Sequence, residues 1–183
     1  MKIILASNSP RRKELLAQAG LKFEIYPSSA EEREIFNGES VTDYAVSLAT
    51  TKATSVYDEK GGVVIGADTI VVLDGEILKK PKEKFDAINM LNRLSGKAHS
   101  VITGYAVIYN DKLYKGYDQT LVIFNELSSE LINSYIESNL WKGKAGGYGI
   151  QDGYPLVKEI SGNYDTVVGL PTNKILNILS ELK

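Results

Sequence analysis

Ile3-Ile4-Leu5-Ala6-Ser7-Asn8-Ser9-Pro10-Arg11-Arg12 is the most informative stretch of this chain. An apolar run, a Ser/Asn turn and a proline at the first helical position predict a strand, a loop and the N-terminus of a helix that continues to Ala19. Free backbone N–H groups and the positive end of the helix dipole would make this loop an anion site, and the two arginines could hold phosphate oxygens. The alternative is an ordinary capped loop with two solvated arginines.

Composition limits the kind of partner that the chain can have. The 183 residues fit a single domain over residues 1–183, and 21 basic against 23 acidic residues give a net charge of −2. Such a balance provides no general attraction to nucleic acid or to an anionic membrane, so a phosphate ligand has to be held locally. Cysteine is absent from the sequence, which excludes thiol chemistry. With no signal peptide or membrane span in the sequence, we expect a soluble cytoplasmic protein.

The order of predicted elements indicates an α/β fold. We expect helices after Ser40, over 83–94, after Ser128 and from Pro171. We expect strands over 22–26, 63–73, 100–109 and 113–124, and a hairpin from Tyr154 to Val168. No linker or internal repeat divides the chain. The predicted architecture is one mixed α/β body with two lobes around a cleft.

Asp68 is the strongest single candidate for chemistry, because it is the only charged residue in the β-branched run from Val63 to Leu73. A buried, unpaired carboxylate costs several kcal/mol, on the order expected for an ion moved out of water, so Asp68 should be paired, bound to a metal or facing a cleft. Gly66 and Ala67 would let a ligand approach closely. The structural alternative is an aspartate that caps a turn or pairs with a buried arginine.

The other candidates carry weaker signals. Glu32 lies in an acidic loop, a feature that is usually solvated surface, but with Asp68 it could supply oxygen ligands to Mg²⁺. Lys52 shares a helical face with alanines and a leucine, where a lysine usually snorkels to solvent. Lys80 is held extended by the following proline and could present its ammonium to a phosphate, although surface exposure is the default. His99 is the only histidine and is expected to be structural. The segment 144–151 ends in Gln151, whose amide could read a base edge, or it is a plain flexible loop.

In combination these motifs resemble the Maf family of nucleotide pyrophosphatases, also described as septum-formation inhibitors. The resemblance rests on segments that follow in order over nearly the whole chain: Leu5 to Arg12, Gly66-Ala67-Asp68-Thr69, Lys80-Pro81, Leu94-Ser95-Gly96, His99-Ser100-Val101, Thr103, Lys144 to Gln151, and Val168-Gly169-Leu170-Pro171. It implies a fold of the Maf and inosine-triphosphatase type, usually dimeric, which here means a homodimer.

The resemblance also implies an activity, the hydrolysis of a nucleoside triphosphate to the monophosphate and pyrophosphate with a divalent metal, Mg or Mn. The ending Tyr148-Gly149-Ile150-Gln151 resembles the branch that acts on dTTP and UTP, and modified pyrimidine nucleotides are further candidate substrates of such a house-cleaning enzyme. Gly147 departs mildly from the alanine that is common in that branch. The alternative is a regulator of cell division that senses nucleotides or binds nucleic acid.

Single residues are matched to roles by the same resemblance. Asp68 matches the proton acceptor, and Glu32 with Asp68 would hold the metal; the adjacent Glu31 is the alternative ligand. Three residues match positions associated with substrate choice: Arg11, Thr69 and Gln151. Other active-site positions are matched by Ser7, Arg12, Lys52 and Lys80.

Overall fold

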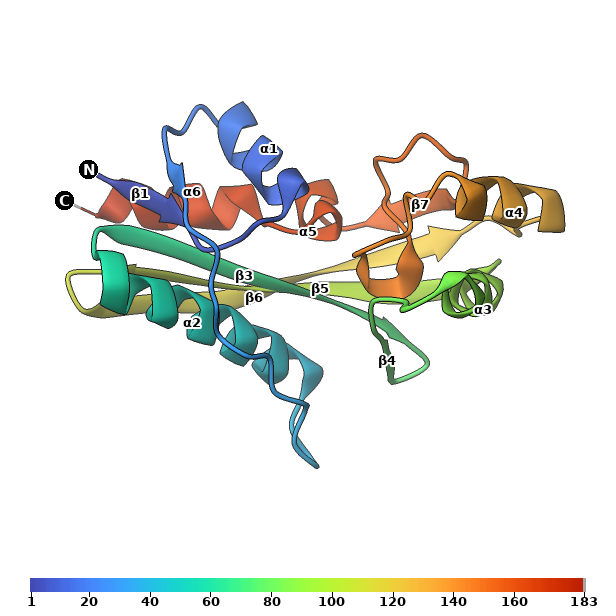
Figure 1. Cartoon of the computed structure of the whole chain (residues 1–183), viewed down its shortest axis with the longest axis horizontal. Helices are drawn as coiled ribbons and strands as arrows, with labels where there is room; N and C mark the ends of the chain where they lie inside the picture. The colour runs from blue at the N-terminus through green and yellow to red at the C-terminus, as the bar shows by residue number, and fades with distance from the viewer. Residues whose placement is uncertain (183) are drawn as a thin grey trace. The chain divides into compact units, whose positions relative to one another are not determined.

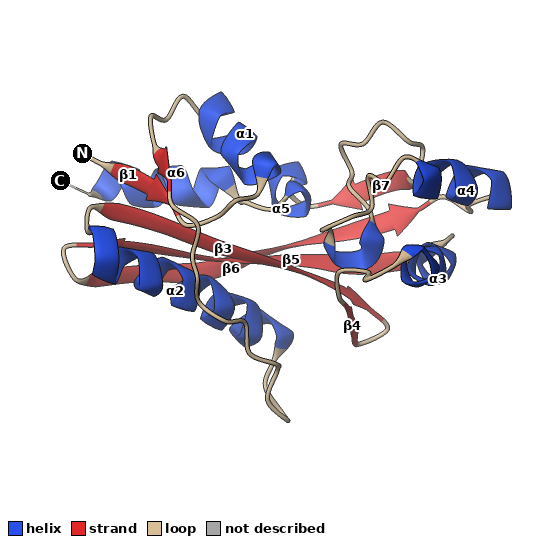
Figure 2. Cartoon of the chain, in the orientation of Figure 1, coloured by secondary structure: helices blue, strands red, loops and turns tan. Residues whose placement is uncertain are grey.

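The computed structural model describes residues 1–182 and has helices and strands throughout (Figures 1 and 2). The strands are β1 (Ile3–Leu5), β2 (Glu24–Ile25), β3 (Val63–Leu73), β4 (Glu76–Leu78), β5 (Ala98–Tyr109), β6 (Lys112–Phe124) and β7 (Val157–Ser161). The helices are α1 (Pro10–Gln18), α2 (Val41–Lys60), α3 (Lys84–Leu94), α4 (Ser129–Glu137), α5 (Tyr164–Val168) and α6 (Thr172–Glu181), with a short 3₁₀ turn, η1 (Ala145–Gly147).

Strand pairing makes the sheet mixed. The hydrogen-bonded order is β2-β1-β3-β5-β6-β7, with β4 paired to β3. β1 runs parallel to β2 and β3, whereas β4 is antiparallel to β3 and β7 is antiparallel to β6. The predicted mixed α/β class is therefore confirmed.

Two compact units divide the chain. The first comprises Met1–Thr69, Thr103–Asp118 and the C-terminal segment from Gly169, and the second comprises Ile70–Ile102 and Gln119–Val168. The strands β3, β5 and β6 contribute residues to both units, because three of the four division points fall within them; the fourth follows α5. One domain over residues 1–183, with a cleft between two lobes, stays a prediction.

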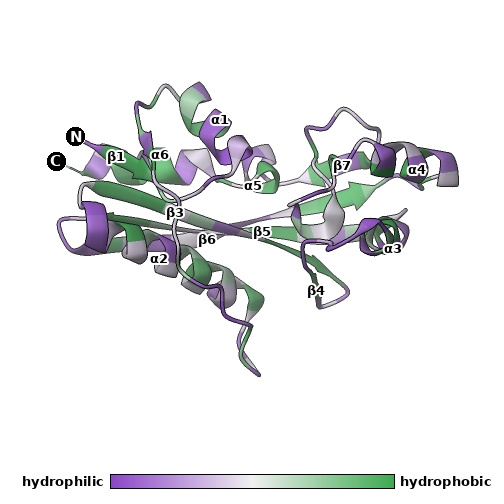
Figure 3. Cartoon of the chain, in the orientation of Figure 1, coloured by the Kyte–Doolittle hydropathy of each residue, from purple (hydrophilic) through white to green (hydrophobic). Residues whose placement is uncertain are grey.

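Small residues bring α2 onto the sheet in the first unit. A Cβ on Gly66 would lie 2.4 Å from the Ala49 carbonyl oxygen, and one on Gly104 would lie 2.3 Å from the Ala45 carbonyl carbon. Glycine at these positions is what allows the helix backbone to approach the strands so closely. Figure 3 shows the matching pattern, with β3 mostly hydrophobic and α2 mixed. The close approach predicted for a ligand at Gly66 is therefore wrong, since α2 itself occupies that face.

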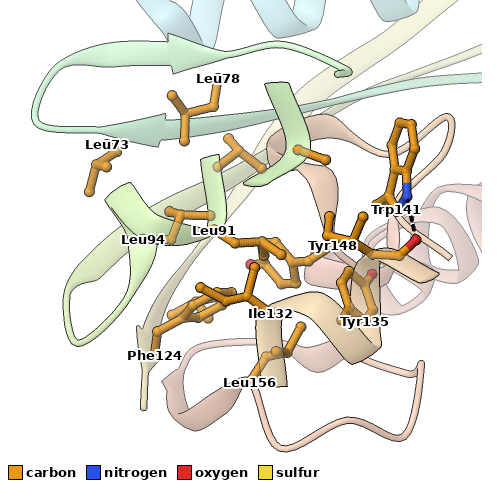
Figure 4. Close-up of a cluster of buried hydrophobic side chains, with 14 of the residues drawn as sticks. Leu73, Leu78, Leu91, Leu94, Phe124, Ile132, Tyr135, Trp141, Tyr148 and Leu156 are labelled. Carbon is orange, nitrogen blue, oxygen red and sulfur yellow. Dashed lines mark hydrogen bonds between the residues drawn. The ribbon is translucent and has the colours of Figure 1, made fainter. Parts of the chain in front are cut away.

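The second unit has its own apolar core, which Figure 4 shows in part. It joins α3 and α4 to the strands and is rich in large side chains, including Phe124, Tyr135, Trp141 and Tyr148. The Trp141 Nε1–H donates to the Ile136 carbonyl at 3.0 Å, so its one polar group is satisfied within the core. This core carries the segment 144–151.

The hairpin predicted from Tyr154 to Val168 is wrong in its second half. Residues Val157–Ser161 form β7 on β6, but Tyr164–Val168 form the helix α5. The cause is Asn163, whose side-chain oxygen accepts from the Asp165 N–H at 3.3 Å and whose backbone N–H and carbonyl are both bonded to the Thr120 hydroxyl at 2.9 Å. Asparagine in this position starts a turn of helix instead of returning a strand. No helix within residues 1–182 is long and apolar enough to cross a membrane.

Candidate active site

The loop between β1 and α1 is built as the sequence predicts. The Ser9 hydroxyl caps α1 by accepting from the Arg12 N–H at 3.4 Å, and Pro10 stands in the first turn. The Ser7 hydroxyl in turn accepts from the Ser9 N–H at 3.1 Å. Strand, loop and helix N-terminus are confirmed, and the positive end of the α1 dipole lies at Pro10 and Arg11.

Arg12 is the connector of the first unit. Its guanidinium donates to the Ser7 hydroxyl at 3.3 Å, to the Thr69 hydroxyl at 3.1 Å and to the Gly169 carbonyl at 2.7 Å. Thr69 is also 2.9 Å from the Thr103 hydroxyl. Burial lowers the pKa of Arg12, while the nearby carboxylate of Asp68 opposes that shift. Arg12 thus ties the anion loop to β3 and to the segment that precedes α6 and is not a solvated arginine. Its contact with a substrate phosphate stays a prediction.

Lys52, Asp68 and Glu32 form a second cluster in the same unit. The Lys52 ammonium lies 2.5 Å from Asp68 Oδ1 and 2.7 Å from Glu32 Oε1. The Lys52 and Asp68 side chains are only 16% and 13% exposed, whereas Glu32 is 50% exposed. Lys52 therefore does not snorkel away from its apolar helix face; it is held between two carboxylates. Of the two adjacent acids, the structure brings Glu32 to this cluster.

Alternation along β3 separates the two clusters. Successive side chains of a strand point to opposite faces, so Asp68 contacts Lys52 on α2 and Thr69 contacts Arg12 on α1. In Figure 1, α1 and α6 lie above β3 and α2 lies below it. Two consecutive residues of one strand thereby connect the anion loop to the carboxylates.

The Glu32 and Asp68 oxygens also fit a divalent cation. Glu32 Oε1 and Asp68 Oδ1 both lie within 2.7 Å of the Lys52 ammonium nitrogen, so the two oxygens already face one positive charge. Within residues 1–182 no group of three or more His, Cys, Asp or Glu side chains can hold a metal. A cation here would take two hard oxygen ligands from the protein and the others from water and phosphate, which is the usual pattern for Mg²⁺.

Lys80 and Gln151 belong to the second unit, and both are exposed. Their segments are linked, because the Gly146 N–H donates to the Lys79 carbonyl at 3.2 Å. Gly146 and Gly147 have positive φ values of 72° and 76°, which a side chain would strain. The segment 144–151 is thus a defined turn beside Lys80 and not a plain flexible loop.

A buried ion pair that the sequence analysis missed closes this turn. Lys144 Nζ lies 2.7 Å from both oxygens of Asp152, and the Tyr135 hydroxyl donates to Asp152 Oδ2 at 2.7 Å. The same hydroxyl accepts from the Gly149 N–H at 3.1 Å. A lysine and an aspartate eight residues apart carry no signal in sequence, because only the fold of the turn brings them together.

His99 is structural, as expected. It is 2% exposed, packs edge-on against Phe124 and Tyr148, and its Nε2 lies 2.6 Å from the Tyr148 hydroxyl. Burial lowers the pKa of His99 to about 4, so the ring is neutral at pH 7. Burial also raises the pKa of Tyr148, so its phenol keeps its proton.

Comparison with known proteins decides the family. The family model described as Maf-like protein matches residues 2–182. The chain belongs to the Maf family. A dTTP/UTP pyrophosphatase of Pyrococcus abyssi is 47% identical to this Maf-like protein over 180 residues, 97% of this chain and 94% of the relative. A dTTP/UTP pyrophosphatase of Aquifex aeolicus is 47% identical over 184 residues, 100% and 96% of the two chains. The Staphylococcus aureus Ham1 protein shares the fold, with a TM-score of 0.60 at 13% identity over 100% of both chains.

Proposed function

We propose that this Maf-like protein hydrolyses dTTP and UTP to the nucleoside monophosphate and pyrophosphate. The observation that carries the proposal is the Lys52–Asp68–Glu32 cluster, in which a nearly buried carboxylate is partnered by a lysine that a second carboxylate shares. Asp68 adjoins Thr69, which is bonded to the anion loop through Arg12. The two Pyrococcus and Aquifex relatives support the same activity by their names.

In this proposal Asp68 is the general base. A water oxygen attacks the α-phosphorus, its proton passes to the Asp68 carboxylate, and the bond from the α-phosphorus to the bridging oxygen breaks as pyrophosphate leaves. The backbone N–H groups of the β1–α1 loop, Ser7 and Arg11 hold phosphate oxygens, and Arg12 keeps that loop in place. Lys52 and Lys80 supply positive charge to the phosphates.

Glu32 and Asp68 would hold the divalent cation, Mg²⁺ or Mn²⁺. When bound, the cation neutralises charge on the triphosphate and polarises a phosphoryl oxygen. Lys52 has to release at least one of its two carboxylates for that to happen, and its ammonium is then available to a phosphate.

Base selection is assigned to Gln151, Thr69 and Arg11. A side-chain amide matches the imide edge of uracil and thymine, because it offers both a donor and an acceptor. The hydroxyl of Thr69 already bonds Arg12 and Thr103, so we expect Thr69 to contribute more through its position than through a free donor. Gln151 is exposed, so its amide is open to solvent.

The decisive experiment measures pyrophosphate release from a panel of nucleotides with Mg²⁺ or Mn²⁺. We expect release from dTTP and UTP well above release from purine triphosphates. Nucleotide binding without release from any member of the panel would favour the regulator instead.

We also propose that the protein is a homodimer and acts in the cytoplasm. Sedimentation equilibrium tests the dimer.

A further inference from the structure

The acidic segment before α2, residues 30–39, is a largely exposed loop that Arg33 holds together. The Arg33 guanidinium donates to both oxygens of Glu39, at 2.8 and 2.5 Å, in a bidentate ion pair. It donates further to the Ser47 hydroxyl on α2 and to the Glu34 carbonyl, each at 3.0 Å. The Arg33 side chain thus connects its own part of the segment to Glu39 and to α2.

The backbone at Arg33 is fixed as well. The Tyr44 hydroxyl on α2 donates to the Arg33 carbonyl at 2.7 Å, and Glu39 Oε2 accepts from the Phe36 N–H at 3.0 Å. The guanidinium carbon lies 4.1 Å from the centre of the Phe36 ring, a cation–π contact. Both the side chain and the peptide of Arg33 are therefore held in place relative to α2.

The residue directly before Arg33 is Glu32, the half-exposed partner of Lys52. Residues 26–36 have no regular secondary structure, so no helix or sheet hydrogen bonds order the backbone at Glu32. Ordering such a residue costs backbone entropy, which a bound cation would otherwise have to supply. The contacts of Arg33 order the adjacent backbone without the cation.

We propose that Arg33, with Glu39, is a positioning residue that keeps Glu32 beside Lys52 and Asp68 and so sets the affinity for the divalent cation. The inference rests on the proposed function, in which Glu32 is a ligand of that cation. Residues that orient metal ligands typically change metal affinity by about 10- to 100-fold when they are replaced.

An ordinary surface ion pair would not have this effect, since exposed pairs contribute little. The Arg33 and Glu39 side chains are 30% and 15% exposed, and each makes further bonds. The chain offers a matched control in Arg93 and Glu76, a bidentate pair whose side chains are 43% and 62% exposed. Arg33 lowers the pKa of Glu39 to about 2, so the pair is intact at any practical assay pH.

The experiment titrates Mn²⁺ into the full-length protein by electron paramagnetic resonance, with Arg33→Lys, Glu39→Gln, Glu32→Gln and Arg93→Lys compared with the parent. Lysine cannot form the bidentate fork, and glutamine lacks the charge. We expect Arg33→Lys and Glu39→Gln to raise the Mn²⁺ Kd by about 10- to 100-fold and Arg93→Lys to leave it unchanged. Saturating Mn²⁺ should restore most of kcat in the first two variants, and hydrogen exchange of the amides over 30–36 should become faster.

The outcomes separate the inference from the proposed function. If Glu32→Gln weakens Mn²⁺ binding while both Arg33→Lys and Glu39→Gln bind like the parent, the positioning role is wrong and the metal role of Glu32 stands. If Glu32→Gln binds Mn²⁺ like the parent, Glu32 is not a ligand and both statements fail. Equal weakening by Arg93→Lys would also overturn the inference. Should Arg33→Lys fail to fold, Glu39→Gln tests the same contact.

Discussion

Two lysine–aspartate pairs, one in each unit, differ in how completely they are closed. Lys144 contacts both oxygens of Asp152, the side chains are 10% and 6% exposed, and Tyr135 donates to the same carboxylate. Lys52 contacts a single oxygen of Asp68 and shares its ammonium with Glu32, which is 50% exposed.

The difference indicates which pair can do chemistry. A buried pair with its partners in place rigidifies the structure, and rearranging it would leave a charge without compensation. A pair whose ammonium is shared with a half-exposed carboxylate can exchange partners at little cost. We therefore interpret Lys144–Asp152 as the support of the Gln151 turn and Lys52–Asp68 as the reactive pair.

Asp68→Asn should have the largest effect. The amide keeps the shape of the side chain but is a much poorer proton acceptor, so kcat for UTP should fall by about 10²- to 10⁴-fold. The free energy of unfolding should change much less than the activity, because Lys52 keeps Glu32 as its partner and no buried charge is left unpaired. Steady-state kinetics and urea unfolding on the same preparation provide both numbers. If the variant keeps most of the parental kcat, Asp68 is not the general base and has a structural role like that of Asp152.

Replacing Lys144 or Lys52 by methionine should lower the free energy of unfolding by different amounts. Lys144→Met leaves a buried carboxylate unpaired and should cost about 3–5 kcal/mol of unfolding free energy. Lys52→Met should cost less than Lys144→Met, since Glu32 is half-exposed and the Arg12 guanidinium remains near the Asp68 carboxylate. Urea unfolding measures both variants. Similar losses would contradict the distinction between a closed and an open pair.

His99 should make the stability of the protein depend on pH. Its pKa is about 4 in the folded protein against a reference value of 6.5, so between these values the unfolded chain binds a proton that the folded one does not. Stability should therefore rise with pH from about 4 to 6.5 and fall by about 3 kcal/mol as the pH drops through that window. His99 bonds the Tyr148 hydroxyl through Nε2, so Gln, whose amide can reach that position without titrating, is the suitable replacement. Tm measured from pH 4 to 7 should vary less for His99→Gln than for the parent; parallel curves would exclude His99 as the cause.

Gln151→Glu should have the smallest effect, on selectivity. A carboxylate can only accept, so one contact to the base becomes repulsive, and discrimination between UTP and purine triphosphates should fall by about 1–2 kcal/mol. The ratio of kcat/KM values for UTP and GTP measures it. A uniform loss of rate with an unchanged ratio would mean that the closed turn presents Gln151 to phosphate and not to the base.

Local patterns anticipated much of the fold. The β-branched run Val63–Leu73 is β3 with the same bounds, and Ser9 and Ser128 cap their helices as predicted. These features depend on neighbours in sequence, which is why the pattern suffices. The second half of the expected hairpin failed because Asn163 bonds Thr120 on a different strand, a contact that no local pattern contains.

The sequence by itself determined the mixed α/β class, the capped anion loop and the prominence of Asp68, because composition, capping residues and a lone charge in an apolar strand are local facts. Tertiary structure alone decided what surrounds them. It brought Arg12 to Gly169, paired Lys52 with Asp68, chose Glu32 over Glu31, and closed Lys144 onto Asp152. Each of these depends on the distance between side chains from separate elements or from a folded turn. Such distances follow from how helices pack on strands, and here from the glycines that let α2 approach the sheet.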